Sequence, residues 1–194
     1  MSQPASKSKP QKISPASNSP LTATAVLRAN ARKNIEDGAI TSTYGADKEV
    51  VIRLLNEALA TEWVCVLRYY RHYFMASGML ADSIKAEFLE HAQQEHEHAN
   101  KIAERIVQLG GEPDLDPDTL TKRAHAEYKV GHDLRDMVKE DLIAERIAID
   151  SYREMINYIG DRDTTTKRIL ESILAQEEEH ADEFSDLLDG WIGN

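Results

Sequence analysis

The sequence of 194 residues is poor in cysteine and has no long apolar run. Its one cysteine, Cys65, excludes an internal disulfide framework and any cysteine-rich zinc or iron–sulfur site. No stretch approaches 18 consecutive apolar residues, and the N-terminus lacks an apolar core, so neither a membrane span nor a secretory signal is expected. We therefore expect a soluble, cytoplasmic protein that does not bind membranes.

Proline is also rare, and its distribution separates the N-terminus from the rest of the chain. Four of the six prolines fall within residues 1–20, together with six serines and only four apolar residues. Such a segment buries too little apolar surface to offset the entropy of ordering, so we predict that it is disordered. Residues 21–40 have the composition of a short helix that docks only on a partner subunit. We take residues 1–40 as a flexible basic extension and residues 41–194 as the folded domain.

Positive charge is scarce beyond residue 35. The chain has 23 Lys and Arg against 34 Asp and Glu, a net charge of −11. Residues 1–35 hold six of the basic residues and no acidic one, which leaves 17 basic and 34 acidic residues in the other 159. An acidic body argues against general nucleic-acid binding and suits a protein that handles cations.

From Asp47 onward the apolar residues recur with helical spacing, and no strand-like alternation is present. We predict helices over about 47–77, 80–109, 131–159 and 163–188, the last ended by Gly190. A short helix is expected around 118–127, in the long connection between the second and third helices. Two short connections and one of about 20 residues predict two helical hairpins packed as a four-helix bundle, an all-α fold.

Each predicted helix carries a carboxylate in the middle of its apolar stripe, where a core residue is expected: Glu62, Glu95, Glu145 and Glu177. A buried carboxylate without a partner costs several kcal/mol, and no Lys or Arg lies beside these four within the stripes. Two divalent cations would balance the four negative charges.

Two histidines strengthen the case for a metal. His98 and His180 each follow a stripe glutamate by three residues, so each pair shares one helix face. The spacing also repeats, since Glu62 precedes Glu95 by 33 residues and Glu145 precedes Glu177 by 32. The hairpins therefore look like pseudo-symmetric halves of a dinuclear carboxylate site. A bundle in which Glu and His pair with each other without metal is the alternative.

At these residues the chain resembles the ferritin-like superfamily, and bacterioferritin most closely. The resemblance lies within residues 46–188, in the segments LNEALATEWVCVLRYY, EHEHANKIAERIVQLGGEPDL, DLIAERIAIDSYREMINYIG and ILAQEEEHADEF. It implies an iron-storage and detoxification protein, a ferroxidase that oxidises Fe(II) to Fe(III) with O2 or H2O2. The mineral would be stored inside a hollow homo-oligomer.

The resemblance also implies roles for individual residues around two iron ions per subunit. Glu62 and Glu145 would be terminal ligands. Glu95 and Glu177 would bridge the two ions, and His98 and His180 would each bind one ion. Tyr69, two turns after Glu62, matches a tyrosine beside the bacterioferritin site, and we include it among the catalytic residues.

The sequence departs from the bacterioferritin pattern in two places. The methionine that holds haem in bacterioferritin is replaced here by His96, so haem is not predicted. Only 14 residues follow His180, too few for the C-terminal helix of bacterioferritin, and the connection between the hairpins is longer. Cages of 12 or 24 subunits are therefore both open. The ligand set that Dps proteins place between subunits is not recognisable.

Three questions stay open at the level of sequence. A dimanganese catalase shares the ligand pattern, so manganese is an alternative to iron. The basic N-terminal extension suits either a Dps-like protection protein that binds DNA through its phosphates or a simple docking arm. His91, one turn before Glu95, is either an accessory ligand or a buried core histidine.

Overall fold

A computed structural model describes residues 20–78 and 81–192, and within these ranges the secondary structure is helical, without strands. This confirms the predicted all-α class. The predicted disorder of residues 1–20 falls almost entirely outside the described residues. The helices are α1 (Thr24–Asn30), α2 (Lys48–Met75), α3 (Ala81–Gln108), α4 (Leu120–Arg123), α5 (Leu134–Ile159) and α6 (Thr164–Ile192), with 3-10 turns at Ile35–Asp37 and Gly160–Arg162.

The chain divides into two compact units, residues 1–35 and 36–194. In the described part of the first unit, α1 has no buried residue, and Val26 and Leu27 are about half exposed. Docking of this helix on a partner subunit and a domain boundary at residue 40 both stay predictions. None of the helices in the described ranges is both long enough and apolar enough to cross a membrane.

The ends of the long helices follow local sequence signals. Asp47 and Asp133 cap α2 and α5, because their side chains accept hydrogen bonds from the backbone N–H three residues ahead. Gly160 ends α5 with a φ of +53°, a conformation that glycine adopts without strain. The predicted stop at Gly190 is wrong. Gly190 does not have a positive φ, and α6 continues through it to Ile192 while Trp191 packs against the core.

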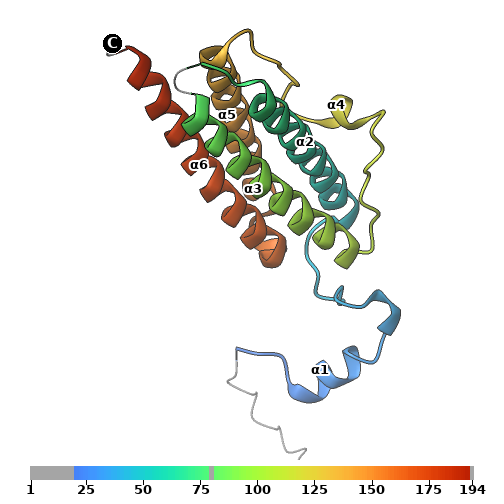
Figure 1. Ribbon diagram of the computed structural model, residues 1–194. Helices are drawn as coiled ribbons and strands as arrows, with labels where there is room; N and C mark the ends of the chain where they lie inside the picture. Colours follow the sequence, from blue (N-terminus) through green and yellow to red (C-terminus); the bar gives the residue numbers. More distant parts are fainter. Residues whose placement is uncertain (1–19, 79–80, 193–194) are drawn as a thin grey trace, which may run out of the picture. The chain divides into compact units, whose positions relative to one another are not determined.

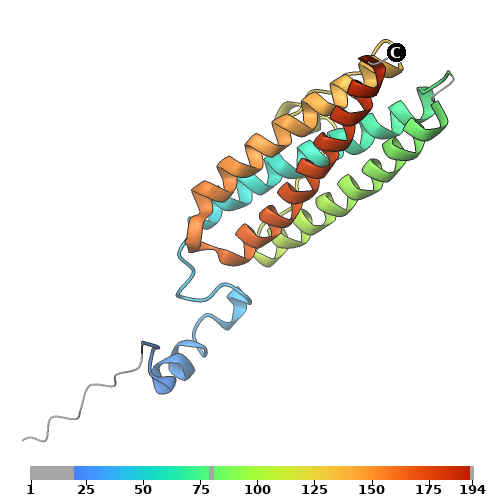
Figure 2. The ribbon, with the colours of Figure 1, turned by 90° about the vertical axis from the view of Figure 1, so that its left-hand side faces the viewer.

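The four long helices form two antiparallel hairpins, α2 with α3 and α5 with α6 (Figure 1). The hairpins pack so that α2 lies beside α5 and α3 lies beside α6, as the view in Figure 2 also shows. The connection from α3 to α5 runs back along α2 and includes α4. Arg123 fixes it by donating to the backbone oxygens of Asn56 and Asp114. This is the predicted four-helix bundle.

Two apolar clusters fill the bundle, one towards each end. The first contains Leu55 of α2, Ile102 of α3 and Ile173 of α6, and the second contains Phe88 of α3 and Phe184 of α6. On every long helix the stripe glutamate lies, in sequence, between members of the two clusters. A polar layer therefore crosses the middle of the bundle with apolar packing on both sides.

Two buried arginines, which the apolar periodicity did not predict, join neighbouring segments of the bundle. Arg68 of α2 donates to Asp141 of α5 at 2.7 Å, and His72 contacts the other oxygen of the same carboxylate at 2.7 Å. Arg105 of α3 pairs with Asp163, just before α6, at 3.0 Å. Neither arginine forms an ion pair with a stripe glutamate within the described ranges.

Candidate metal centre

The structure brings all six predicted ligands together in the polar layer of the bundle. They come from the four long helices, and each is at most 2% exposed. We call this set the six-residue centre; it consists of Glu62, Glu95, His98, Glu145, Glu177 and His180. The repeat noticed in the sequence places one lone glutamate and one Glu-x-x-His from each hairpin around a common point.

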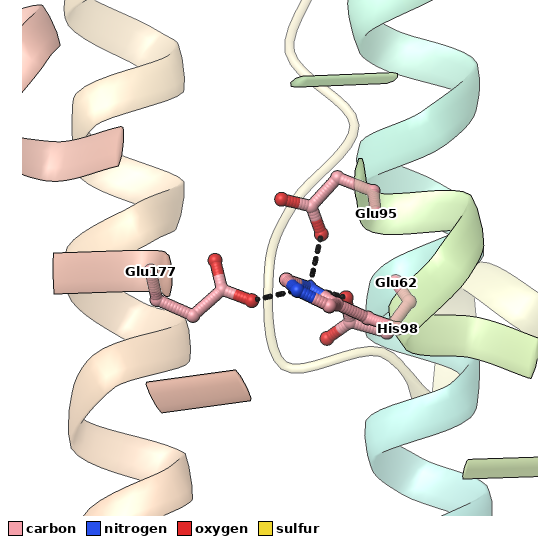
Figure 3. Close-up of side chains that lie close together, drawn as sticks. All are labelled: Glu62, Glu95, His98 and Glu177. Carbon is pink, nitrogen blue, oxygen red and sulfur yellow. Dashed lines mark ion pairs between the residues drawn. The ribbon is translucent and has the colours of Figure 1, made fainter. Parts of the chain in front are cut away.

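The side chains form two groups, and the first surrounds Nδ1 of His98 (Figure 3). This nitrogen lies 3.0 Å from Oε1 of Glu177 and 3.3 Å from Oε2 of Glu62. Oε2 of Glu95 lies 3.9 Å from it. Donor atoms from three helices therefore converge on one small volume.

The second group surrounds Nδ1 of His180 and reuses two of the glutamates. Oε1 of Glu95 lies 3.3 Å from this nitrogen, and Oε2 of Glu177 lies 3.7 Å from it. Glu145 completes the group with Oε2 at 3.7 Å. Glu95 and Glu177 each have one oxygen near His98 and the other near His180, so they belong to both groups. Glu62 and Glu145 each belong to one group.

Whether a metal fits the centre can be judged from its buried oxygen and nitrogen atoms that could bind one. Most of these atoms have no hydrogen-bond partner. Five of the six residues have at least one such atom: Oε2 of Glu62, Oε1 of Glu95, Nδ1 of His98, both oxygens of Glu177 and Nδ1 of His180. Unpaired buried polar atoms are rare in folded proteins because each loses its hydration without replacement. Carboxylate oxygens with one imidazole nitrogen per group are a donor set that suits Fe(II) or Mn(II).

Two glutamines hold the histidines in a ligating orientation. Nε2 of His98 lies 3.0 Å from Oε1 of Gln176, and Nε2 of His180 lies 2.7 Å from Oε1 of Gln94. A carbonyl oxygen can only accept, so each Nε2 carries a proton, and Nδ1 is the nitrogen of each ring that faces the centre.

Two tyrosines hold the two glutamates that belong to one group each, by hydrogen bonds from their hydroxyl groups. Tyr69 of α2 donates to Oε1 of Glu145, and Tyr152 of α5 donates to Oε1 of Glu62. The resemblance in sequence points to Tyr69 but not to Tyr152. It follows Glu145 by seven residues, just as Tyr69 follows Glu62 by seven, so the pseudo-symmetry already contained the signal.

The glutamines carry a similar signal that the sequence analysis missed. Gln94 directly precedes Glu95, and Gln176 directly precedes Glu177, so both halves contain Gln-Glu-x-x-His. The remaining polar residues considered earlier lie outside the centre. Cys65 is buried in the second apolar cluster, and His96 is exposed and contacts the ring of Trp63.

The protonation of the centre reflects crowded negative charge. Burial, followed by repulsion from Glu62 and Glu145, raises the pKa of Glu177 to about 8. Burial and the neighbouring carboxylates, Glu177 first, raise the pKa of Glu95 as well. Burial disfavours the charged form of His98, but the carboxylates of Glu177 and Glu62 outweigh it and raise the pKa of this imidazole to about 11. In the metal-free protein, protons therefore supply part of the compensation that cations would give.

Comparison with known proteins decides the family. The sequence profile of the ferritin-like domain matches residues 52–191. The chain belongs to the ferritin-like family. This ferritin-like protein is 31% identical over 134 residues to the bacterioferritin of Rhodobacter capsulatus, an alignment that covers 68% of the chain and 78% of that relative.

Two further ferritin-like relatives bear on function. The chain is 31% identical over 150 residues to the DNA protection during starvation protein of Pyrococcus furiosus, which covers 75% of the chain and 80% of the relative. A bacterioferritin-related protein from Bacteroides fragilis, described as a dodecameric thioferritin, superposes with a TM-score of 0.74 at 34% identity. That match covers 76% of this chain and 89% of the other. These matches confirm the ferritin-like bundle that the sequence predicted.

Proposed function

We propose that this ferritin-like protein oxidises Fe(II) to Fe(III) at the six-residue centre and stores the product in an oligomeric shell. The observation that carries the proposal is the set of buried donor atoms without partners, arranged in two groups that share Glu95 and Glu177. Such an arrangement is costly without cations and is matched in charge by two divalent ions.

Each residue of the centre has a defined task in this proposal. Glu62 and Glu145 would each hold one ion as terminal ligands, and Glu95 and Glu177 would be shared by the two ions. His98 and His180 supply one imidazole nitrogen each. When bound, the iron pair supplies the two-electron redox chemistry that reduces O2 or H2O2.

The surrounding side chains prepare the centre for the ions. Gln94 and Gln176 keep both histidines in the tautomer that ligates through Nδ1. Tyr69 and Tyr152 restrain the terminal glutamates, which limits their rotation when ions enter. Because the pKa of Glu177 lies near 8, ion binding displaces protons from the carboxylates, and uptake near neutral pH releases acid.

Storage requires a shell, and we propose that this chain forms one from identical subunits. Support comes from the dodecameric Bacteroides fragilis protein and from the excess of acidic residues beyond residue 35, which would concentrate cations. Twelve and 24 subunits are the two alternatives. The mass of the native oligomer, measured before and after loading with Fe(II) in air, tests storage directly.

The double variant Glu95→Ala with His98→Ala tests the oxidation site. It removes one shared ligand and one imidazole, and we expect it to abolish rapid aerobic oxidation of about two Fe(II) per subunit while helicity by circular dichroism is kept. Glu104→Gln, an exposed change on α3, is the control. Oxidation at the wild-type rate in the double variant would refute the assignment.

Manganese chemistry is a second candidate, because the same oxygen-rich donor set accepts Mn(II). A dimanganese catalase would contain manganese as isolated and would disproportionate hydrogen peroxide without added iron. Metal analysis of the native protein, combined with an oxygen-evolution assay, separates the two functions.

DNA protection is a third candidate, supported by the Pyrococcus furiosus relative and by the six basic residues within residues 1–35. Several subunits in one shell would multiply that charge and bind phosphates without reading sequence. A gel-shift comparison of the full chain with a chain lacking residues 1–35 tests it. DNA binding that survives the deletion would show that residues 1–35 are not responsible for it.

A further inference from the structure

A second cluster of metal-binding side chains lies beside the six-residue centre and is not used by the proposed oxidation. It consists of Glu87 and His91 of α3 and Glu183 of α6, each of which offers a ligand atom within 4.8 Å of the others. Nε2 of His91 lies 2.8 Å from Oε2 of Glu183. The cluster thus has the composition of one half of the centre, two carboxylates and one imidazole.

The cluster connects solvent with the buried layer. The side chain of Glu183 is 46% exposed and Glu87 is partly exposed, whereas His91 is 1% exposed. The rings of His91 and His180 stack with their centroids 4.1 Å apart. On α3, Glu87, His91 and Glu95 are each four residues apart and therefore share one face. Donor groups form a continuous series from the surface to the centre.

The charges of the cluster are poorly compensated. Neither Glu87 nor Glu183 forms an ion pair with a Lys or Arg in the described ranges. Nδ1 of His91 is buried without a hydrogen-bond partner. Burial and the nearby Glu183 raise the pKa of Glu87.

We propose that Glu87, His91 and Glu183 form a third cation site, which binds a divalent transition-metal ion such as Fe(II) and passes it to the six-residue centre. This inference rests on the proposed function only for the identity of the receiving site. The partly exposed carboxylates capture the ion from solvent, and His91 brings it next to the ring of His180. The ion keeps its charge throughout, so the step involves no oxidation.

Cobalt(II) binding to the full chain tests the site without relying on activity. By equilibrium dialysis and metal analysis we expect three Co(II) per wild-type chain and two per Glu87→Gln/Glu183→Gln chain. Both changes are isosteric and lie at or near the surface, so the bundle is retained. The matched control is Glu104→Gln/Asp182→Asn, with one exposed carboxylate changed on each of the same two helices; it should still bind three ions.

Iron oxidation gives the second readout. At Fe(II) concentrations below saturation, we expect Glu87→Gln/Glu183→Gln to oxidise iron about tenfold more slowly than wild type, because the charges that collect cations are gone. The number of irons oxidised rapidly per chain should stay at about two. The control pair should follow wild type in both measurements.

The outcomes separate this inference from the proposed function. In the Glu95→Ala/His98→Ala variant, one Co(II) should remain, bound at the third site. Equal Co(II) stoichiometry in wild type and Glu87→Gln/Glu183→Gln would overturn the third site while leaving the centre intact. If wild type and the Glu95→Ala/His98→Ala variant bind the same number of ions, the six-residue centre itself is refuted.

Discussion

The buried carboxylates should make the metal-free protein less stable as the pH rises, and Glu177 allows the size of the effect to be calculated. Its pKa is about 8 in the folded protein, against an ordinary value of 4.5. Because the folded value is the higher one, the stabilising contribution of the protonated carboxyl is complete below pH 4.5 and is lost as the pH rises through 8. At 1.36 kcal/mol per pH unit, the loss at pH 7 is about 3 kcal/mol.

Glu177→Gln should remove that loss, because a neutral amide of the same shape replaces the carboxylate. At pH 7 the chelator-treated variant should be about 3 kcal/mol more stable than wild type, or about 6–12 °C higher in Tm for a domain of this size. The assay is thermal unfolding between pH 5 and 9 at constant protein concentration. Glu179→Gln, an exposed change on the same helix, should follow wild type throughout.

Added metal should reverse the order of stability. Wild-type protein gains stability from ions bound between its carboxylates, whereas the amide of Glu177→Gln removes a shared ligand and most of that gain. Two results would refute the reasoning: metal-free wild type whose stability does not change between pH 5 and 8, or a Gln variant that is no more stable than wild type at pH 7.

Three further predictions address other parts of the bundle. Tyr152→Phe removes the donor to Glu62 and should weaken Co(II) binding by about ten- to a hundredfold in calorimetric titrations, whereas Tyr158→Phe, on the same helix and partly exposed, should not. Asp141→Asn leaves the buried guanidinium of Arg68 without its counter-charge and should lower the free energy of unfolding in urea by about 3–5 kcal/mol; a loss below about 1 kcal/mol would contradict the importance of this pair. Gly190→Ala should raise the free energy of unfolding by about 0.5–1 kcal/mol, because α6 is continuous there and no atom lies near the added methyl group, whereas Gly160→Ala should lower it because of the positive φ. An unfavourable Gly190→Ala would indicate that the helix ends earlier.

Helix positions and the six residues that converge in the centre could be predicted because both depend on periodicity within single helices. Glu62 and Glu95 stand out since a carboxylate interrupts an apolar stripe, and that interruption is visible without knowledge of the neighbouring helices. Gly190 shows where such reasoning fails: glycine permits a helix to end but does not require it, and the packing of Trp191 favours continuation.

The contacts that support the ligands were harder to predict because they depend on how the helices are rotated against each other. Arg68 and Asp141 lie 73 residues apart in the sequence, and only the alignment of α2 with α5 brings them within 2.7 Å. Tyr152 and Gln94 were missed for the same reason, although the repeat between the two hairpins places equivalent residues at the same offsets. Internal symmetry can therefore reveal supporting residues that periodicity within one helix does not.

The contacts that support the centre have a consequence for a chain that is cut into its two hairpins. Tyr69 and Gln94, from the first hairpin, contact residues of the centre that belong to the second hairpin, and Tyr152 and Gln176 contact those of the first. A hairpin on its own therefore lacks these contacts to its part of the six-residue centre. If the chain were cut in the α3–α5 connection, the two fragments would have to reassociate before either could bind metal tightly, and metal would in turn drive their reassociation. Tight metal binding would then indicate that the two halves of the bundle are correctly joined.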